Sequence, residues 1–393
     1  MRMRRPEAGW VFTLRNQLLA RDLAYQERLA SPMSRIRPFA LGDVPRVAEL
    51  HERVFAESSH LSIEKRRRYL GQVFLENPWY DDALPSLVCE AEGGRIVGFL
   101  GVLPRRMSWH GRPIKVAIAS QFMVEPHHRG LTGLLLLKTF LSGPQDLSMT
   151  DGATHESARI WKAVGGTDSP LHSIHWTRPL RPVRYGLSLV SEHVPLAAAT
   201  AGPFCAVVDA IVARMRRSPF WLTTATSGEE LTVDAILDSS HQFTPDAALR
   251  PEYDRGSLKW LLELAEQKAS SGDLRKMLVR NADHEVIGWY LYYLRRGGSS
   301  EVLHIAGRHD DLSEVLEHLF YNAWREGALA VSGRLQPGLF DALRARHCLF
   351  HDRGSPVLVH SRRRGLVDAV RCGDASLSRL DGEWWMCFQD GVS

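Results

Sequence analysis

Residues 116–141 contain a β-rich run, a glycine-containing turn and an apolar helix, one directly after another. Of all segments of the sequence, this one constrains the fold most strongly. The turn contains Gly130 and Gly133, and the helix follows it directly. Backbone N–H groups at a helix N-terminus have no partner inside the helix, and the helix dipole adds positive potential there. Glycine also lets a ligand approach the main chain closely. The stretch therefore predicts an anion site, although such a turn also serves as an ordinary helix cap.

Hydrophobic patterns between residues 35 and 180 predict an α/β (α+β) domain with the order β-α-α-β-β-β-α-β-α-β. Two turn-forming dipeptides, Gly93-Gly94 and His110-Gly111, predict two hairpins. The predicted strands are 36–41, 86–92, 95–103, 116–124, 147–151 and 171–177, and the predicted helices are one after Asp43 and those at 62–77, 130–141 and 154–164.

From residue 247 the same kind of order recurs, although no sequence repeat connects the two halves. The predicted helices are 253–267, 312–325 and 338–346, and the predicted strands are 276–280, 286–294, 302–306, 328–331, 349–350 and 356–360. Asp310 and Asp311 precede the second of these helices, where they would satisfy its N–H groups and add negative charge. The second half is therefore predicted to lack the anion site.

These patterns divide the chain into an N-terminal helical extension (1–34), a first domain (35–180), a linker with an apolar helix (181–245) and a second domain (246–393). The extension lacks the apolar core of a secretory signal. The apolar segment 194–215 is about long enough to cross a membrane. Because Asp209 and Arg214 interrupt it, we expect a helix buried between the domains and no stable membrane insertion.

The C-terminal region places Trp384 and Trp385 beside acidic residues. We expect these two rings to pack a C-terminal strand against a domain; the alternative is that they line an acceptor pocket.

Composition indicates a globular protein and little more. The net charge is +4 with a pI near 8.8, but 45 acidic residues oppose a role in binding nucleic acid. The 5 cysteines are widely spaced without a Cys-x-x-Cys motif, which argues against a disulfide framework and a four-cysteine zinc site. His347 and His351 stand four residues apart on either side of Cys348, but this spacing alone is insufficient evidence for a metal site. We expect a cytoplasmic protein without a metal.

The first domain resembles the GCN5-related N-acetyltransferase (GNAT) superfamily. The resemblance extends over about residues 35–180 and rests on IRPFALGDVPRVAELHERVF, FMVEPHHRGLTGLLLLKTFL and DGATHESARIWKAVGG. It implies two GNAT-like acyl-CoA acyltransferase folds in tandem, each a mixed, mostly antiparallel sheet flanked by helices, with a degenerate second copy. The family's pyrophosphate signature, Gln/Arg-x-x-Gly-x-Gly/Ala, is matched by Arg129, but Thr132 and Leu134 stand where small residues are expected.

The resemblance implies acetyl-CoA or another acyl-CoA as cosubstrate. Because Asp310 and Asp311 add negative charge at the equivalent turn of the second copy, we expect one cofactor site, in the first copy. The main chain of Phe122, Met123 and Val124 would contact the pantetheine amides. Thr154 replaces an asparagine of the family and would cap its helix and bind a cofactor amide. The N–H groups that would hold the pyrophosphate are those of Arg129, Gly130, Leu131, Thr132, Gly133 and Leu134.

The reaction that the resemblance implies is direct attack of an amine on the acyl thioester. A tyrosine that many family members carry is Trp161 here, so water or another side chain must protonate the leaving thiolate. An amine with a pKa of about 10.4 also needs a base or a water chain at neutral pH. The candidates within range by sequence are Glu125, His127, Asp151 and His155.

Three functions remain open. The first is an N-acyltransferase, using acetyl-CoA by expectation, that modifies an amine of a small molecule or sugar. The second is a non-catalytic acyl-CoA-binding or regulatory protein, which Trp161 and the irregular loop favour. The third is a tandem aminoacyl transferase resembling the peptidoglycan-bridge enzymes, which would need a basic surface for RNA. The sequence does not indicate the oligomeric state.

Overall fold

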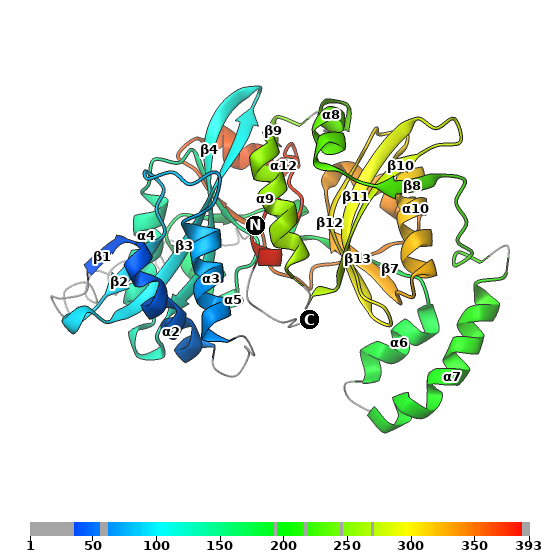
Figure 1. The fold of residues 1–393 in the computed structure, drawn as a ribbon, viewed down its shortest axis with the longest axis horizontal. Helices are drawn as coiled ribbons and strands as arrows, with labels where there is room; N and C mark the ends of the chain where they lie inside the picture. The colour runs from blue at the N-terminus through cyan, green and yellow to red at the C-terminus, as the bar shows by residue number, and fades with distance from the viewer. Residues whose placement is uncertain are drawn as a thin grey trace, which may run out of the picture.

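Two β-sheets lie side by side with helices packed on their faces (Figure 1). The computed structural model describes residues 35–386 apart from 56–61, 192–194, 216–217, 244–246 and 269–270. The extension predicted over residues 1–34 lies outside the described residues.

The first sheet is built from the first half of the chain with two additions from the second half. Its strands are β1 (Arg35–Pro38), β2 (Leu87–Glu90), β3 (Ile96–Trp109), β4 (Arg112–Val124), β5 (Leu147–Thr150), β6 (Thr167–Asp168), β9 (Leu249–Pro251) and β15 (Leu358–His360). They follow the order β1-β2-β3-β4-β5-β15-β6, and β9 pairs with β3 outside this path. The β4–β5 pair is parallel and the other pairs are antiparallel.

Helices cover both faces of the first sheet. The helices α2 (Val44–Val54) and α3 (Ile63–Phe74) pack on one face, and α4 (Leu131–Leu141) and α5 (His155–Ala163) pack on the other. Two glycines of β3 allow this close packing. A Cβ atom on Gly101 would lie 2.4 Å from the Phe74 ring of α3, and one on Gly98 would lie 2.8 Å from Leu136 of α4.

The second sheet has the same arrangement of one parallel pair among antiparallel neighbours. Its strands are β7 (His175–Pro179), β8 (Ser227–Glu230), β10 (Asp273–Arg280), β11 (Val286–Leu294), β12 (Ser299–Gly307), β13 (Ala330–Arg334) and β14 (Leu349–His351). Their order is β14-β7-β13-β12-β11-β10-β8, with β12 and β13 parallel. The helices α10 (Leu312–Arg325) and α11 (Phe340–Ala345) follow β12 and β13 in the chain.

Each sheet has a strand from the other half of the chain between two of its own strands, in addition to β9 at the side of β3. β15 lies between β5 and β6 in the first sheet, and β7 lies between β13 and β14 in the second. The strand predicted at 171–177 as the last of the first domain therefore belongs to the second sheet, and its first residues, Leu171–Ser173, form a 3-10 turn. The domain boundary at residue 180 remains a prediction from sequence.

The apolar linker segment forms a helical hairpin that projects from the second sheet (Figure 1). Its helices are α6 (Pro182–Ser191) and α7 (Pro195–Val212). The expectation that this segment is buried between the domains is wrong, because Phe204 is 73% exposed and Val207 and Ile211 are also exposed. In the part of the chain that the structure describes, no helix has the length and apolarity required to span a bilayer.

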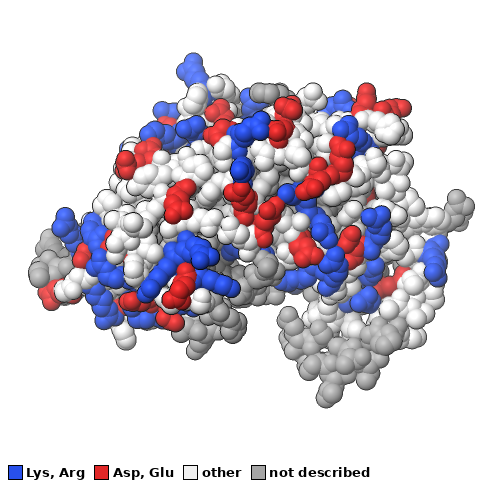
Figure 2. Space-filling model, in the orientation of Figure 1, with Lys and Arg blue, Asp and Glu red and all other residues white. Residues whose placement is uncertain are grey.

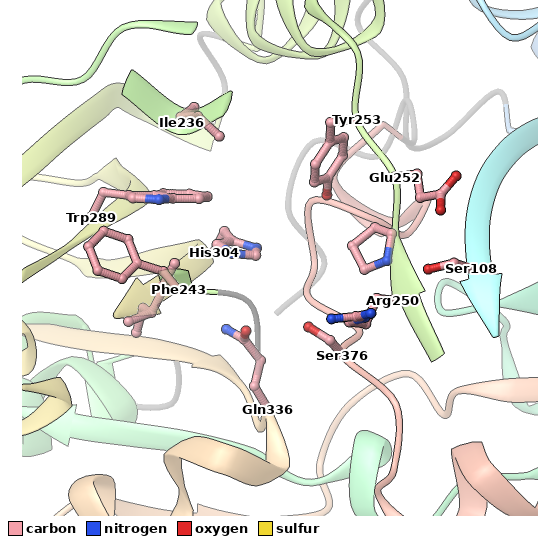
Figure 3. Close-up of a pocket in the computed structure, with 13 residues that line it drawn as sticks. Ser108, Ile236, Phe243, Arg250, Glu252, Tyr253, Trp289, His304, Gln336 and Ser376 are labelled. Carbon is pink, nitrogen blue, oxygen red and sulfur yellow. The ribbon is translucent and has the colours of Figure 1, made fainter. Parts of the chain in front are cut away.

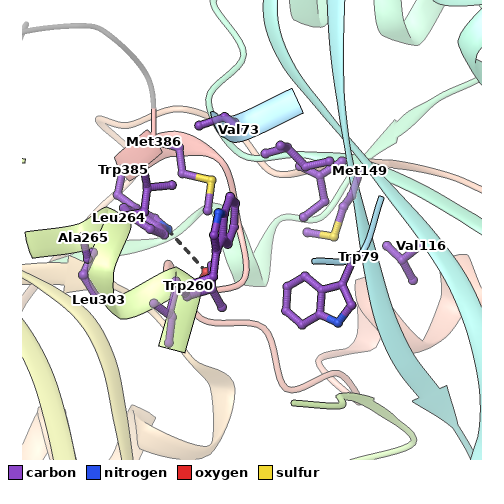
Figure 4. Packing of buried hydrophobic residues seen from close by; sticks show 14 of the residues in the cluster. Val73, Trp79, Val116, Met149, Trp260, Leu264, Ala265, Leu303, Trp385 and Met386 are labelled. Atoms are coloured by element: carbon purple, nitrogen blue, oxygen red, sulfur yellow. Dashed lines mark hydrogen bonds between the residues drawn. The ribbon is translucent and has the colours of Figure 1, made fainter. Parts of the chain in front are cut away.

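The C-terminal segment 375–386, here called the tail, is buried where the two halves meet. Figure 4 shows Trp385 and Met386 of the tail close to Trp260 and Leu264 of α9 (Arg255–Glu266). The same apolar cluster includes residues of both sheets. The predicted packing role of the tryptophans agrees with this burial, but Trp384–Met386 forms a 3-10 turn rather than a strand. Helices α8 (Val233–Phe243) and α12 (Arg364–Cys372) complete the described fold.

His172 joins the two halves beneath the tail and makes the fold sensitive to acid. Its Nε2 lies 3.1 Å from the carbonyl oxygen of Ala375, and its Nδ1 lies 3.0 Å from the hydroxyl of Ser169. Burial lowers the pKa of His172 from 6.5 to about 4. The unfolded chain therefore binds a proton that the folded chain does not, and stability falls as the pH drops below about 6.5.

We expect the substitution His172→Gln to reduce this pH dependence, because glutamine donates a hydrogen bond but does not titrate. Between pH 7.5 and 5 the wild-type protein should lose about 2 kcal/mol more unfolding free energy than the variant. Urea unfolding at the two pH values measures the difference. An equal loss in both proteins would show that His172 does not contribute.

Candidate functional site

Strands β4 and β5 part in the middle of the first sheet. Their parallel pairing ends at Ile118 and Met149, and no later residue of β4 pairs with β5 in the described part of the chain. Beyond this point Gln121 and Phe122 of β4 lie opposite the single residue Leu100 of β3, which forms a β-bulge. The main chain of residues 119–124 is thus left without a strand partner on the β5 side, and we call this opening the β4–β5 cleft.

Two polar side chains at the bulge have buried atoms without a hydrogen-bond partner among the described residues. The hydroxyl of Ser120, a residue only 1% exposed, has no hydrogen-bond partner among the described residues. The same holds for the buried Nε2 atom of Gln121, whose φ of 49° is uncommon for a residue with a side chain. Sequence reasoning missed both residues, although Ser-Gln inside an otherwise apolar strand was a visible signal.

The turn after β4 presents a free helix N-terminus. Gly130 precedes α4 with φ 97° and ψ −95°, a conformation that requires glycine, and no side chain caps the helix. The helix begins with the bond from the N–H of Leu134 to the carbonyl of Gly130 (2.9 Å). Arg129 and Gly130 are exposed, whereas the side chains of Thr132 and Leu134 are buried. Of the predicted anion-binding N–H groups, those of Leu134 and Arg129 donate to the carbonyls of Gly130 and Pro126, and those of residues 130–133 lie at the helix end.

The predicted pantetheine-binding residues lead directly to this helix end. Phe122 and Val124 approach the start of α4, since a Cβ atom on Gly133 would lie 3.4 Å from the Phe122 ring and 3.8 Å from Val124. Met123 points to the opposite face and is buried among apolar residues beneath α2 and α3. The structure thus brings 122–124 and 129–134 together along one continuous strand, turn and helix.

Thr154 and Trp161 have structural roles on α5. The Thr154 hydroxyl accepts a hydrogen bond from the N–H of Ser157 (3.2 Å) and caps the helix, as predicted. Trp161 is buried, and its indole N–H donates to the carbonyl of Val359 in β15 (3.4 Å). Trp161 therefore fixes the exchanged strand to the first sheet.

Two of the four acid–base candidates, Glu125 and His127, lie at the turn, and His155 lies on α5. Glu125 is buried and ion-paired with Arg53 (2.8 Å) and Arg95 (2.5 Å). Burial raises the pKa of Glu125, but the hydrogen bonds from Arg95 and Arg53 outweigh it and lower the pKa overall, so the carboxylate stays ionised. His127 and His155 are exposed, at the turn and at the first residue of α5.

Asp151, the fourth candidate, belongs to a buried polar cluster between the halves. Its carboxylate pairs with Arg334 at the end of β13 (2.5 Å), and both side chains are almost completely buried. It also accepts hydrogen bonds from the N–H groups of Glu383 (2.7 Å) and Trp384 (3.0 Å) in the tail. Glu383 in turn accepts from the Thr150 hydroxyl at the end of β5 (2.8 Å). The cluster joins the ends of β5 and β13 to the tail.

The corresponding turn in the second half differs in charge. Asp311 precedes α10, but the prediction that the aspartates cap this helix is wrong, because no side chain there caps it. Asp311 instead pairs with Arg308 (2.6 Å). In the described residues no group of three or more His, Cys, Asp or Glu side chains is arranged to hold a metal ion.

The first sheet thus opens between two parallel strands, beside a helix N-terminus without a side-chain cap. Comparisons with known proteins match this part of the chain to an acyltransferase fold. Residues 35–141 match the family model described as "Acetyltransferase (GNAT) domain", so the chain contains a GNAT domain. No curated protein matches the sequence.

Solved structures share this fold at low sequence identity. A GCN5-related N-acetyltransferase from Anabaena variabilis is 11% identical over 84% of this chain and 73% of its own, with a TM-score of 0.55. A probable N-acyltransferase from Enterococcus faecalis is 10% identical over 84% and 72%, with a TM-score of 0.54. The N-myristoyltransferase of Saccharomyces cerevisiae is 10% identical over 85% and 81%, with a TM-score of 0.50. Alignments of this length include both sheets.

Proposed function

We propose that the protein is an acyl-CoA-dependent N-acyltransferase with its one cofactor site in the first half. The observation that carries the proposal is the β4–β5 cleft leading directly into the uncapped N-terminus of α4. Coenzyme A needs donors for a pyrophosphate and main-chain partners for its pantetheine amides. The N–H groups at 130–133 and the unpaired main chain of 119–124 offer both.

The proposed reaction is attack of an amine nitrogen on the thioester carbon, which breaks the C–S bond and releases the CoA thiolate. The nitrogen loses a proton and the thiolate gains one. We infer that Gln121 and Ser120 at the bulge, whose buried polar atoms have no partner among the described residues, would hydrogen-bond the oxygen that becomes negative in the tetrahedral intermediate. Deprotonating an amine of pKa about 10.4 at pH 7 costs about 4.6 kcal/mol, which a water chain or a base must offset.

A non-catalytic acyl-CoA-binding protein is the second candidate. Glu125 and Asp151 are held in ion pairs, and Trp161 donates its N–H to β15. Because these contacts hold Glu125, Asp151 and Trp161 in structural roles, none of the three is assigned to transfer a proton at the cleft. The aminoacyl transferase candidate finds less support, because basic and acidic side chains are interspersed over the face shown in Figure 2.

Two measurements test the proposal. Acetyl-CoA at 100 times its Kd should stabilise the protein by about 2.7 kcal/mol. With a panel of small-molecule amines and acetyl-CoA, free thiol detected by a colorimetric reagent should then appear only when protein and acceptor are both present. Stabilisation without thiol release across the panel would favour the binding protein. No stabilisation by millimolar acetyl-CoA, CoA or longer acyl-CoA would contradict both candidates.

A further inference from the structure

A cavity of about 410 Å³ lies between the two halves, away from the turn before α4. One wall comes from α8, β11 and β12, and the other from β9, the end of β3 and the tail (Figure 3). Its volume is in the range of pockets that hold small organic ligands. The cavity shares no lining residue with the proposed acyl-CoA site.

The wall from the second half is aromatic and uncharged. Trp289 and His304 stack with ring centroids 4.5 Å apart and planes 15° apart, and Phe243 and Ile236 of α8 stand beside them (Figure 3). Burial lowers the pKa of His304 to about 4, so its ring is neutral at pH 7. No charged side chain lines this wall among the described residues. The charged groups that line the cavity, Arg250 and Glu252, belong to the opposite wall.

Two buried polar atoms on the aromatic wall have no partner among the described residues. They are the indole Nε1 of Trp289 and the Nδ1 of His304, and both residues are more than nine-tenths buried. Figure 3 shows both rings directed toward the middle of the cavity. Leaving such a group unsatisfied costs about 1–3 kcal/mol. An indole N–H only donates, so its missing partner is a hydrogen-bond acceptor.

The cavity occupies the place where the second sheet opens. The pairing of β12 with β13 ends at Val302 and Gly333, and His304 follows on β12. This repeats the parting of β4 and β5 in the first sheet. However, Asp310 and Asp311 follow β12 where a pyrophosphate would need positive potential. The opening in the second sheet therefore suits a ligand other than coenzyme A.

We propose that this cavity binds an uncharged planar aromatic molecule that carries a carbonyl or ring nitrogen on its edge. The ring lies against Trp289 and His304, and its acceptor atom receives the Trp289 N–H.

The test uses three neutral planar lactams, 2-quinolone, 1-isoquinolone and benzimidazolone, in saturation-transfer NMR titrations of the full-length protein. We expect at least one to bind, and its ring-saturated analogue to bind roughly tenfold more weakly because it cannot stack. Trp289→Phe keeps an aromatic ring but removes the donor, so affinity should fall roughly five- to tenfold. Ser376→Leu, which fills part of the cavity, should abolish binding.

A matched control separates this effect from a change in the core. Trp176 is also fully buried in the second sheet with an unpartnered indole N–H among the described residues, but it does not line the cavity. Trp176→Phe should leave the affinity unchanged, and circular dichroism should report that all three variants are folded. The proposal is overturned if no lactam binds, or if Trp289→Phe and Trp176→Phe have equal effects.

Discussion

Gly130→Asp is expected to abolish stabilisation of the protein by acetyl-CoA. Gly130 is the residue before α4, where a Cβ atom would meet no neighbour within 4 Å, but its φ of 97° strains any residue with a side chain, so the turn must also adjust. Its carboxylate would cap the N–H groups that the pyrophosphate needs and repel the pyrophosphate itself. Thermal unfolding with and without acetyl-CoA measures the loss, and the expected shift falls from about 2.7 kcal/mol at 100 times Kd to near zero.

Two controls separate binding from folding. Gly111 also has a positive φ and space for a Cβ atom, but it lies in the β3–β4 hairpin turn. Gly111→Asp should therefore keep the acetyl-CoA shift. Asp311→Gly at the start of α10 should keep it too. If Asp311→Gly removed the shift and Gly130→Asp kept it, the cofactor site would belong to the second half.

Asp151→Ala is expected to reduce the unfolding free energy by about 3–5 kcal/mol. The substitution leaves the Arg334 guanidinium buried without its counter-charge. It also removes the acceptor for the N–H groups of Glu383 and Trp384, which holds the tail against β5. Denaturant unfolding of both proteins measures the difference.

The size of this effect depends on burial, and two variants test that cause. Lys162 and Asp168 form an exposed pair, so Asp168→Asn should cost less than about 1 kcal/mol. The double variant Asp151→Leu/Arg334→Met removes both buried charges and should be more stable than Asp151→Ala. A small loss in Asp151→Ala, similar to that in Asp168→Asn, would show that the pair is not essential to the fold.

Local sequence signals predict most of the elements and the main chain of the candidate site. The predicted helix 62–77 contains α3, the predicted helix 312–325 coincides with α10, and the turn before α4 lies where Gly130 predicts it. Each of these features depends on residues a few positions apart. For the same reason, the main chain of the proposed cofactor site could be predicted from sequence alone.

Features that join distant residues were not predictable in this way. β15 resembles any short apolar strand, and nothing in residues 358–360 indicates that it pairs with β5 instead of a neighbour in its own half. The Asp151–Arg334 pair joins residues 183 positions apart. The unpartnered polar groups at Ser120 and Gln121 depend on a bulge, whose position follows from strand register rather than from composition.

The exchange of β7 and β15 limits how ligands enter. A cleft between two independent lobes can open by rotation about a hinge, because few main-chain bonds cross it. Here the halves are tied by hydrogen bonds of β15 with β5 and β6, and of β7 with β13 and β14. Separating the two halves of the chain would break these ladders, and the chain segments that lead to β7 and β15 cross between the sheets and limit rotation of one sheet relative to the other. We therefore expect ligands to enter and leave through movements of loops and side chains rather than by separation of the two sheets. We also expect neither half to fold when it is expressed alone.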